Sequence, residues 1–266
     1  MSPNAPLITL TTDFGHDSPY VAAMKGVILG INPAARLVDL CHEVPPQDVR
    51  HAAFILAAAV PYFPADALHV VVVDPGVGSD RALLYVETGK HRLLAPDNGC
   101  WTPLLADGAA PVRVIRLAEP RYWRQPVSAT FHGRDILAPV AGHLSLGLAP
   151  EKLGPEAADW VRLPWPSPTS RKSGMHGEVL FVDRFGNLIT NIPAESVRSR
   201  PTVLVVGKRK LRRGFRWVRT YAEAEPGQLV ALISSFGTLE VAVVQGNAAK
   251  RLGAAISTAV SIGWGK

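Results

Sequence analysis

The run Leu68-His-Val-Val-Val-Val73 decides the fold class, and the segment Asp74-Pro-Gly-Val-Gly-Ser-Asp-Arg81 follows it directly. An almost unbroken series of β-branched residues is typical of a strand that is covered on both faces within a parallel sheet. The glycine-rich segment predicts a loop at the carboxyl end of that strand. The sequence therefore predicts an α/β sheet with a polar loop at one edge.

Strand and helix patterns alternate around this run. Ser18 and Pro19 are typical of a helix N-cap and first turn, and apolar residues recur at helical spacing from Val21 to Ile31. Asp48 is expected to cap an alanine-rich helix that reaches about Tyr62. Further strands are predicted at 7–12, 36–41, 82–87, 91–95 and 112–116, and a third helix near 135–146. This alternation indicates right-handed βαβ units, and hence a Rossmann-like α/β domain over residues 1–163.

The composition changes after this region. Residues 164–176 are rich in proline and serine, which is typical of a linker. Beyond them lie short apolar runs divided by glycine turns, at 177–183, 202–206, 229–234 and 239–244, with a short helix expected at 248–252. We therefore predict a second, all-β domain over residues 177–266, a small antiparallel barrel or a sandwich.

The net charge of +6, from 28 Lys and Arg against 22 Asp and Glu, is concentrated in one segment. No acidic residue lies between Glu195 and Glu223, and without the nine cations of that segment the rest of the chain has 19 against 22, a net charge of −3. Such a run is usually the solvated face of a hairpin, although Phe215 and Trp217 would also suit a nucleic-acid groove. The nine cations are Arg198, Arg200, Lys208, Arg209, Lys210, Arg212, Arg213, Arg216 and Arg219.

The remaining composition points to a globular cytoplasmic protein without a membrane segment. Apolar residues make up 47% of the chain, which excludes a disordered protein. Cys41 and Cys100 are too few for a disulfide framework, which fits a reducing compartment. The first residues show no basic region of a signal peptide, and the longest apolar stretches are too short to span a bilayer.

Polar motifs follow two of the predicted strands. Thr11-Thr-Asp-Phe-Gly-His-Asp-Ser18 ends the first strand, and the loop from Asp74 to Arg81 ends the hydrophobic one. Ligands of open α/β sheets bind outside the carboxyl ends of the strands, although a lone Asp there often only caps a turn. The glycine-rich loop matches neither a Walker A sequence nor G-x-G-x-x-G, so a nucleotide triphosphate site is not expected.

Three further clusters carry candidate chemistry. Thr130-Phe-His-Gly-Arg-Asp135 precedes the third predicted helix, where its histidine suits a general base, a ligand or a neighbour of the helix cap. Asp183-Arg-Phe-Gly-Asn187 begins a motif that ends at Asn191, and a plain β-turn explains it equally well. Ser234-Ser-Phe-Gly237 and Gly246-Asn-Ala-Ala249 lie in the second domain.

The order of these motifs, with Ala95-Pro-Asp-Asn-Gly99 between them, resembles the S-adenosyl-L-methionine (SAM) hydroxide adenosyltransferases over essentially the whole chain. These enzymes are the hydrolytic relatives of fluorinating and chlorinating adenosyltransferases. The resemblance implies hydrolysis of SAM to adenosine and L-methionine by water or hydroxide at the ribose 5′ carbon, with no cofactor and no metal. It also implies an α/β domain followed by a β-barrel, in a homotrimer whose active sites lie between subunits.

The resemblance also implies site residues. Asp74, Arg81 and His132 match the groups around the attacking water. Substrate contacts fall into three sets: Asp13 at the ribose hydroxyls; Asp17, Ser18, Asp183 and Ser235 at the methionine portion; Phe185, Asn187, Asn247 and Ala248 at adenine. Halogenating relatives typically carry Tyr in place of Asp74 and lack the histidine at 132, and the fluorinating branch has Arg where this chain has Phe236.

Three alternatives stay open on the sequence. One is a SAM-dependent halogenase of the same superfamily. Another is a metal-dependent phosphohydrolase with Asp13, His16, Asp74, His132 and Asp135 as ligands, although no tight ligand spacing such as H-E-x-x-H occurs. The third is an RNA-binding module that uses the basic stretch 198–219, a partner that the net acidity of the rest of the chain disfavours.

Overall fold

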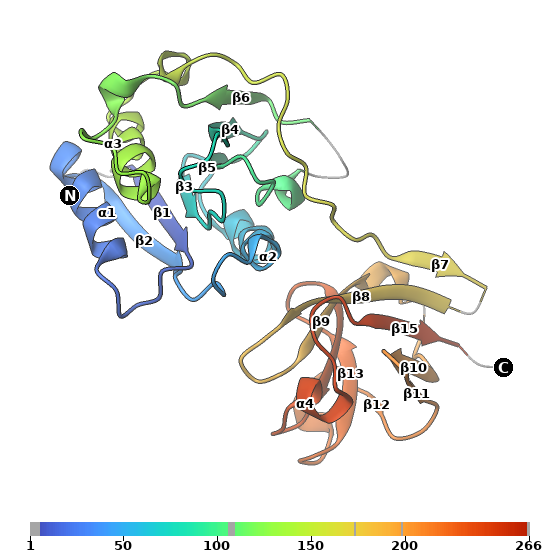
Figure 1. Cartoon of the computed structure of the whole chain (residues 1–266). Coiled ribbons are helices and arrows are strands. Elements are labelled where there is room, and N and C mark those ends of the chain that lie inside the picture. Colours follow the sequence, from blue (N-terminus) through green and yellow to red (C-terminus); the bar gives the residue numbers. More distant parts are fainter. Residues whose placement is uncertain (1–5, 106–109, 173, 198, 265–266) are drawn as a thin grey trace. The chain divides into compact units, whose positions relative to one another are not determined.

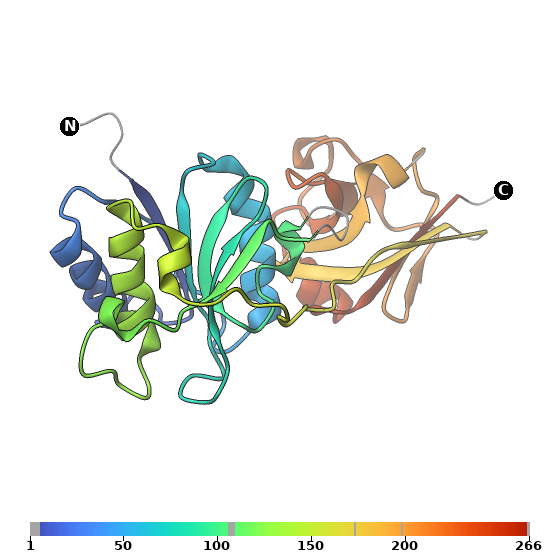
Figure 2. The same cartoon turned by 90° about the horizontal axis from the view of Figure 1, so that it is seen from above.

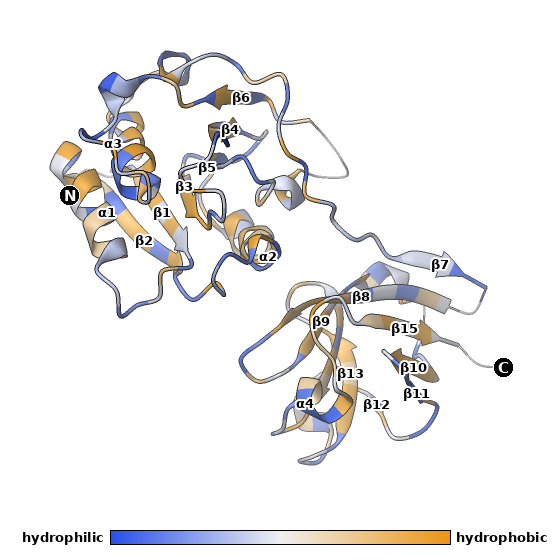
Figure 3. Ribbon diagram, in the orientation of Figure 1, coloured by the Kyte–Doolittle hydropathy of each residue, from blue (hydrophilic) through white to orange (hydrophobic). Residues whose placement is uncertain are grey.

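A computed structural model of the chain describes residues 6–105, 110–172, 174–197 and 199–264, and it divides into two units, Met1–Pro164 and Trp165–Lys266 (Figure 1). Each unit has its own hydrophobic core. Hydrophobic residues follow the strands and helices of each unit (Figure 3). The described helices all lack the combination of length and apolar character that crossing a membrane requires.

The first unit is built on a six-stranded sheet in the order β2-β1-β3-β5-β4-β6. Strands β1 and β2, β1 and β3, and β3 and β5 pair in parallel, which confirms the predicted α/β class. Strand β4 runs antiparallel to both β5 and β6, so the sheet is mixed and the βαβ alternation is interrupted there. The strands are β1 (Leu7–Thr12), β2 (Arg36–Cys41), β3 (Leu68–Val72), β4 (Leu83–Glu87), β5 (Arg92–Pro96) and β6 (Arg113–Arg116).

Helices cover both faces of this sheet. Helices α1 (Tyr20–Ile31) and α3 (Ala138–Ser145) lie on one face and α2 (Val49–Ala59) on the other (Figure 2). Val70 and Val72 pack toward α1 and α3, while Val71 packs toward α2. Every residue of β3 is buried, as its β-branched run predicts.

Of the two predicted helix N-caps, the structure confirms one and contradicts the other. Asp48 caps α2 as predicted, because its carboxylate accepts a hydrogen bond from the backbone of His51. The prediction that Ser18 caps α1 is wrong, because the Ser18 hydroxyl donates to the Phe14 carbonyl and Pro19 occupies the cap position. Helix α2 ends at Ala59, and a 3₁₀ turn that contains Pro61 continues to Tyr62.

The second unit is a nine-stranded, mostly antiparallel sheet in the order β11-β10-β15-β8-β9-β14-β13-β12, with β7 paired to β8. The all-β prediction is confirmed, and the described strands form a curled half-barrel with β11 and β12 at its edges (Figure 1). Strands β7, β9 and β15 lie outside the runs predicted above, and β7 falls within the segment 164–176 predicted as a linker. The elements are β7 (Thr169–Arg171), β8 (Gly174–Val182), β9 (Leu188–Pro193), β10 (Val203–Val206), β11 (Arg209–Leu211), β12 (Arg216–Trp217), β13 (Leu229–Ile233), β14 (Thr238–Val243), α4 (Ala248–Leu252) and β15 (Ala259–Gly263).

The basic stretch includes a hairpin, as expected. Strands β10 and β11 pair antiparallel across a turn at Gly207 and Lys208. The chain then passes from the edge strand β11 to the opposite edge strand β12. All the cations of this stretch that the structure describes are exposed, and Arg198 lies outside the described residues.

Candidate active site

The loop after β3 folds back on itself and brings Arg81 against Asp74. The Val77 amide donates to the Asp74 carbonyl at 3.2 Å, and the Ser79 amide donates to the Gly76 carbonyl at 3.1 Å. A side chain at Gly76 would place its Cβ 3.1 Å from Cγ of Arg81, so glycine leaves room for the arginine stem. The sequence between the two charged residues therefore determines that they meet.

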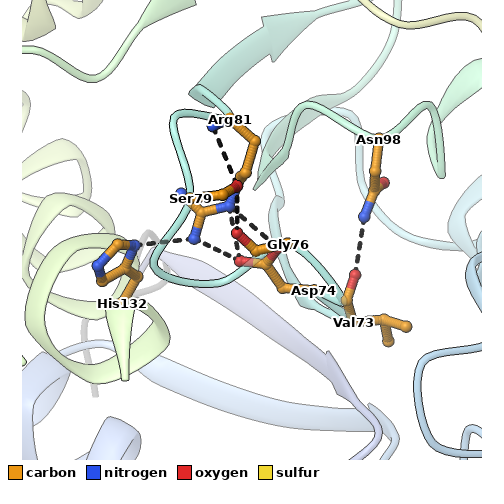
Figure 4. A network of polar contacts seen from close by, with 7 residues as sticks. All are labelled: Val73, Asp74, Gly76, Ser79, Arg81, Asn98 and His132. Atoms are coloured by element: carbon orange, nitrogen blue, oxygen red, sulfur yellow. Dashed lines mark hydrogen bonds and ion pairs between the residues drawn. The ribbon is translucent and has the colours of Figure 1, made fainter. Parts of the chain in front are cut away.

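Asp74 and Arg81 form a two-pronged ion pair. Nε of Arg81 donates to Oδ1 and Oδ2 of Asp74 at 3.0 and 2.9 Å, and Nη2 donates to Oδ2 at 2.5 Å (Figure 4). The side chains are only 7% and 14% exposed. Charge-assisted bonds of this geometry fix both groups in direction, and solvent screens a sheltered pair less than an exposed one.

His132 completes the cluster. Its Nδ1 lies 2.8 Å from Nη2 of Arg81. A guanidinium can only donate hydrogen bonds, so Nδ1 must accept and the imidazole proton must sit on Nε2. Burial, and next the positive charge of Arg81, hold the pKa of His132 below its usual value, although Asp74 and Asp135 raise it in part. The neutral imidazole therefore offers an Nε2–H donor.

A close helix contact places His132 at this edge of the sheet. The residue directly precedes the π-helical turn Gly133–Leu137, which leads into α3. A Cβ on Gly133 would lie 2.8 Å from Cγ1 of Val72, the last residue of β3. Only glycine lets the backbone approach the strand end so closely. The predicted catalytic residues Asp74, Arg81 and His132 are thus brought together.

Asp13 leaves the same edge of the sheet. It follows Thr12, which pairs with Val72 in the parallel ladder between β1 and β3. Oδ2 of Asp13 accepts the Gln47 amide at 2.8 Å, and Gln47 adopts a positive φ of 66°. Asp17 is exposed, and Ser18 lies beside it at the start of α1. Gln47 is a neighbour of the site that sequence reasoning missed, because nothing in the pattern marks its backbone.

In the second unit, Asp183 organises the turn between β8 and β9. Its Oδ1 accepts the amides of Phe185 and Asn187 at 2.9 and 2.8 Å, and its Oδ2 accepts from Nδ2 of Asn187 at 2.9 Å. Gly186 has φ of +84°, and a Cβ there would collide with Asn247. The β-turn interpretation of this motif is therefore correct, and the turn still leaves Phe185 76% exposed.

A cavity of about 670 Å³ opens beside this turn. Asp183, Phe185 and Asn187 line it on one side. Tyr221 lines it as well, and its hydroxyl donates to the carboxylate of Glu240, which is only 4% exposed. Burial raises the pKa of Glu240. Sequence reasoning missed Tyr221 and Glu240, because they lie in no motif and meet only through the fold.

Of the other substrate contacts predicted in this unit, Asn247 and Ala248 lie near the Asp183 turn, but Ser235 does not. Asn247 lies against Gly186, and its side chain caps α4 by accepting the Lys250 amide at 2.7 Å, while Ala248 is fully buried. Ser235 lies in the turn between β13 and β14. Because Thr238 pairs with Pro193 and Val241 with Leu188, that turn lies at the end of β9 opposite to Asp183. The described second unit therefore does not bring Ser235 to the cavity.

The residues proposed as metal ligands are occupied by other partners. Asp135 is fully buried and accepts hydrogen bonds from Arg124, Arg134 and the Ser128 amide, while Asp74 is held by Arg81. Within the described ranges, no group of three or more His, Cys, Asp or Glu residues is placed to hold a metal ion. The geometry therefore gives the phosphohydrolase alternative no support.

Sequence and structure comparisons place the chain in a family. Models described as the SAM hydroxide adenosyltransferase N-terminal and C-terminal domains match residues 8–154 and 177–261. The chain belongs to the SAM hydroxide adenosyltransferase family.

Individual relatives agree with this assignment. The chain is 42% identical to an (R)-S-adenosyl-L-methionine hydrolase of Salinispora tropica, covering 93% of this chain and 94% of the relative. It is 27% identical to a fluorinase of Nocardia brasiliensis, over 89% and 90% of the two chains. The crystal structure of an uncharacterized conserved protein from Thermotoga maritima superposes with a TM-score of 0.90 at 34% identity, over 97% and 100% of the two chains.

Proposed function

We propose that this protein hydrolyses SAM to adenosine and L-methionine, and that it acts on the (R) configuration at sulfur. The observation that carries the proposal is the Asp74–Arg81–His132 cluster at the carboxyl edge of the sheet. Membership of the family, and the greater identity to a hydrolase than to a fluorinase, support the same reaction.

The chemistry needs few protein groups. Methionine leaves a sulfonium as a neutral thioether, so no acid has to protonate the leaving group. The nucleophile must be held in line with the C5′–S bond, and such positioning alone lowers the barrier substantially. As the new C–O bond forms, the water oxygen becomes strongly acidic, so an ordinary carboxylate is basic enough to accept its proton.

The contacts of the cluster suggest how the roles divide. Among the described residues, Asp74 and His132 engage Nε and Nη2 of Arg81, which leaves the two N–H groups of Nη1 for an oxygen ligand. The Nε2–H of His132 is a further donor. Oδ1 of Asp74 accepts only one of the three bonds from Arg81, so it retains capacity for a proton. We assign proton acceptance to Asp74, and orientation of the water to Arg81 and His132.

Substrate binding follows the family pattern. The Asp13 carboxylate suits the two ribose hydroxyls, since it can accept from both. Phe185 is exposed and offers a ring face for adenine, and Asn187 lines the same cavity. Asn247 lies against Gly186 of the same turn, and the buried Ala248 follows it, so we assign both to the support of the adenine pocket. The methionine portion is assigned to Asp17, Ser18 and Asp183. Ser235 receives no role in the proposal, because it lies at the end of β9 opposite to Asp183.

A homotrimer with active sites between subunits completes the proposal. Residues 1–164 carry 13 Lys and Arg against 16 Asp and Glu, a net charge of −3, whereas residues 165–266 carry 15 against 6, a net charge of +9. This opposite charge favours contact between the first unit of one subunit and the second unit of the next. The two free cysteines support a cytoplasmic location.

The test is direct. Purified protein treated with EDTA is incubated with the (R) and (S) diastereomers of SAM, and the products are separated by liquid chromatography. We expect adenosine and methionine from the (R) form, and we expect Asp74→Ala to bind SAM while losing most turnover. Absence of turnover, a requirement for added metal, or a halogenated nucleoside formed from chloride or fluoride would overturn the proposal.

A further inference from the structure

One short turn, at Asp97 and Asn98, is hydrogen-bonded to both ends of the loop that carries Asp74 and Arg81. The loop leaves the sheet at Val73 and returns to it at Ala82. The Asp97 amide donates to the Ala82 carbonyl at 2.9 Å. Nδ2 of Asn98 donates to the Val73 carbonyl at 2.8 Å (Figure 4). This turn belongs to the motif 95–99, which the proposed chemistry leaves without a role.

The side chain of Asn98 is held in one orientation. Its Oδ1 accepts the amide of Cys100 at 3.1 Å, so its NH₂ group must face Val73. Both Val73 and Cys100 are fully buried, which prevents water from replacing either bond. An amide alone supplies a donor and an acceptor with this geometry, since a carboxylate keeps the acceptor and loses the donor.

The consequence falls on Asp74. Val73 follows the last residue of β3, so its carbonyl lies beyond the described ladder and Asn98 takes the place of a strand partner. Without that donor, the buried carbonyl has to turn toward another partner, and the backbone that carries Asp74 turns with it. A displacement of about 1 Å at a reacting group costs about 100-fold in rate.

We propose that Asn98 is a positioning residue, which acts on catalysis by fixing the backbone at Asp74 and thereby the Asp74–Arg81–His132 geometry. The inference rests on the proposed SAM hydrolysis. Asn98 itself touches none of the three side chains in the contacts of the described residues.

The chain offers a matched control. Asn32, at the end of α1, is 4% exposed. Its Nδ2 donates to Oγ of Ser145 at 2.8 Å, and its Oδ1 accepts the Ala34 amide at 3.0 Å. Like Asn98, it therefore accepts a backbone amide two residues further on and donates to an oxygen, here a hydroxyl instead of a carbonyl. Asn32→Ala therefore removes equivalent interactions without touching the loop.

The experiment compares Asn98→Asp, Asn98→Ala and Asn32→Ala by steady-state kinetics, thermal unfolding and NMR of labelled histidine. We expect kcat to fall by about 10- to 100-fold in both Asn98 variants with KM within about twofold, and the His132 resonance to shift. Asn32→Ala should lose comparable stability but keep kcat and the resonance. Where Asn98→Ala does not fold, Asn98→Asp decides, since it keeps the bond from Cys100.

Unchanged kcat and an unchanged His132 resonance in folded Asn98→Asp would overturn the inference, as would an equal loss of kcat in Asn32→Ala. The resonance needs no turnover. If the wild-type protein fails to hydrolyse SAM but the resonance still shifts in the Asn98 variants alone, the proposed function fails while the positioning role stands.

Discussion

The position of one proton decides whether Nε2 of His132 donates a hydrogen bond to the attacking water or accepts a proton from it. Nδ1 faces a group that can only donate, so the neutral Nε2–H form is the one compatible with the contact to Arg81. Protonation would set an N–H of the imidazolium against an N–H of the guanidinium, and both groups would be positive. The contact is therefore specific for the neutral state.

This gives a prediction for the pH dependence of activity. Burial and Arg81 lower the pKa of His132 below 6.5, so the residue is neutral at pH 7 and becomes charged only in more acid solution. We expect kcat/KM to be constant above the lowered pKa and to fall by about tenfold per pH unit below it. Two-dimensional ¹H–¹⁵N spectra at pH 7 should show the proton on Nε2. A proton on Nδ1 would contradict this account.

At the residue scale, the sequence predicts the members of the site better than their arrangement. Asp74, Arg81 and His132 stand in recognisable motifs, and the structure brings them together. The protonation of His132, and the contacts of Asn98 and Tyr221, depend on residues that lie 19 to 51 positions apart in the sequence. No local pattern records such contacts, so only the fold reveals them.

At the scale of elements, the approach of the π-helical turn to β3 holds His132 in place. Gly133→Ala would put a methyl group 2.8 Å from Cγ1 of Val72 and 3.4 Å from Sδ of Met24. We expect a loss of about 1–3 kcal/mol in the free energy of unfolding, from overpacking, together with a fall in kcat as His132 moves away from Arg81. Chemical denaturation and kinetics measure the two effects.

Two further variants complete that test. Val72→Ala in the Gly133→Ala background should restore part of the activity, because it removes the methyl group that clashes. Gly26→Ala, in α1, is the control, since a Cβ there meets nothing within 4 Å and alanine favours a helix by up to about 1 kcal/mol. Wild-type stability and activity in Gly133→Ala would show that the close contact is unimportant.

Element types follow from the sequence where the local pattern is strong. The β-branched run predicts β3, and Asp48 predicts the start of α2. The reversed direction of β4 could not be predicted, since its residues would suit either direction, and its pairing depends on β5 and β6. Strand β9 has no apolar strand pattern in the sequence, because it contains the polar residues Thr190 and Asn191. Both side chains are buried, and they donate hydrogen bonds to the Leu239 and Pro166 carbonyls.

At the scale of the whole molecule, the proposed trimer predicts complementation between defective subunits. Asp74→Asn damages only the first unit and Asn187→Ala only the second. The two variants are unfolded together in equal amounts and refolded as a mixture. If each site combines units from two subunits, about one quarter of the sites then receive an intact first unit and an intact second unit. Activity of the mixture should therefore approach 25% of wild type.

The control for complementation is each variant refolded alone, which should stay inactive. Light scattering should give a mass about three times the 28.5 kDa of one chain. An inactive mixture of correctly sized, folded trimers would place each complete site within a single chain. A monomer in solution would remove the trimer from the account altogether.

In the proposed reaction, water attacks the 5′ carbon of SAM at the Asp74–Arg81–His132 cluster. The most direct measurement is mass spectrometry of the products formed from (R)-SAM in H₂¹⁸O by EDTA-treated protein. We expect one ¹⁸O atom in the 5′-hydroxyl of adenosine, none in methionine, and loss of the labelled product in Asp74→Ala. Unlabelled adenosine, or labelled adenosine formed equally fast by Asp74→Ala, would contradict it.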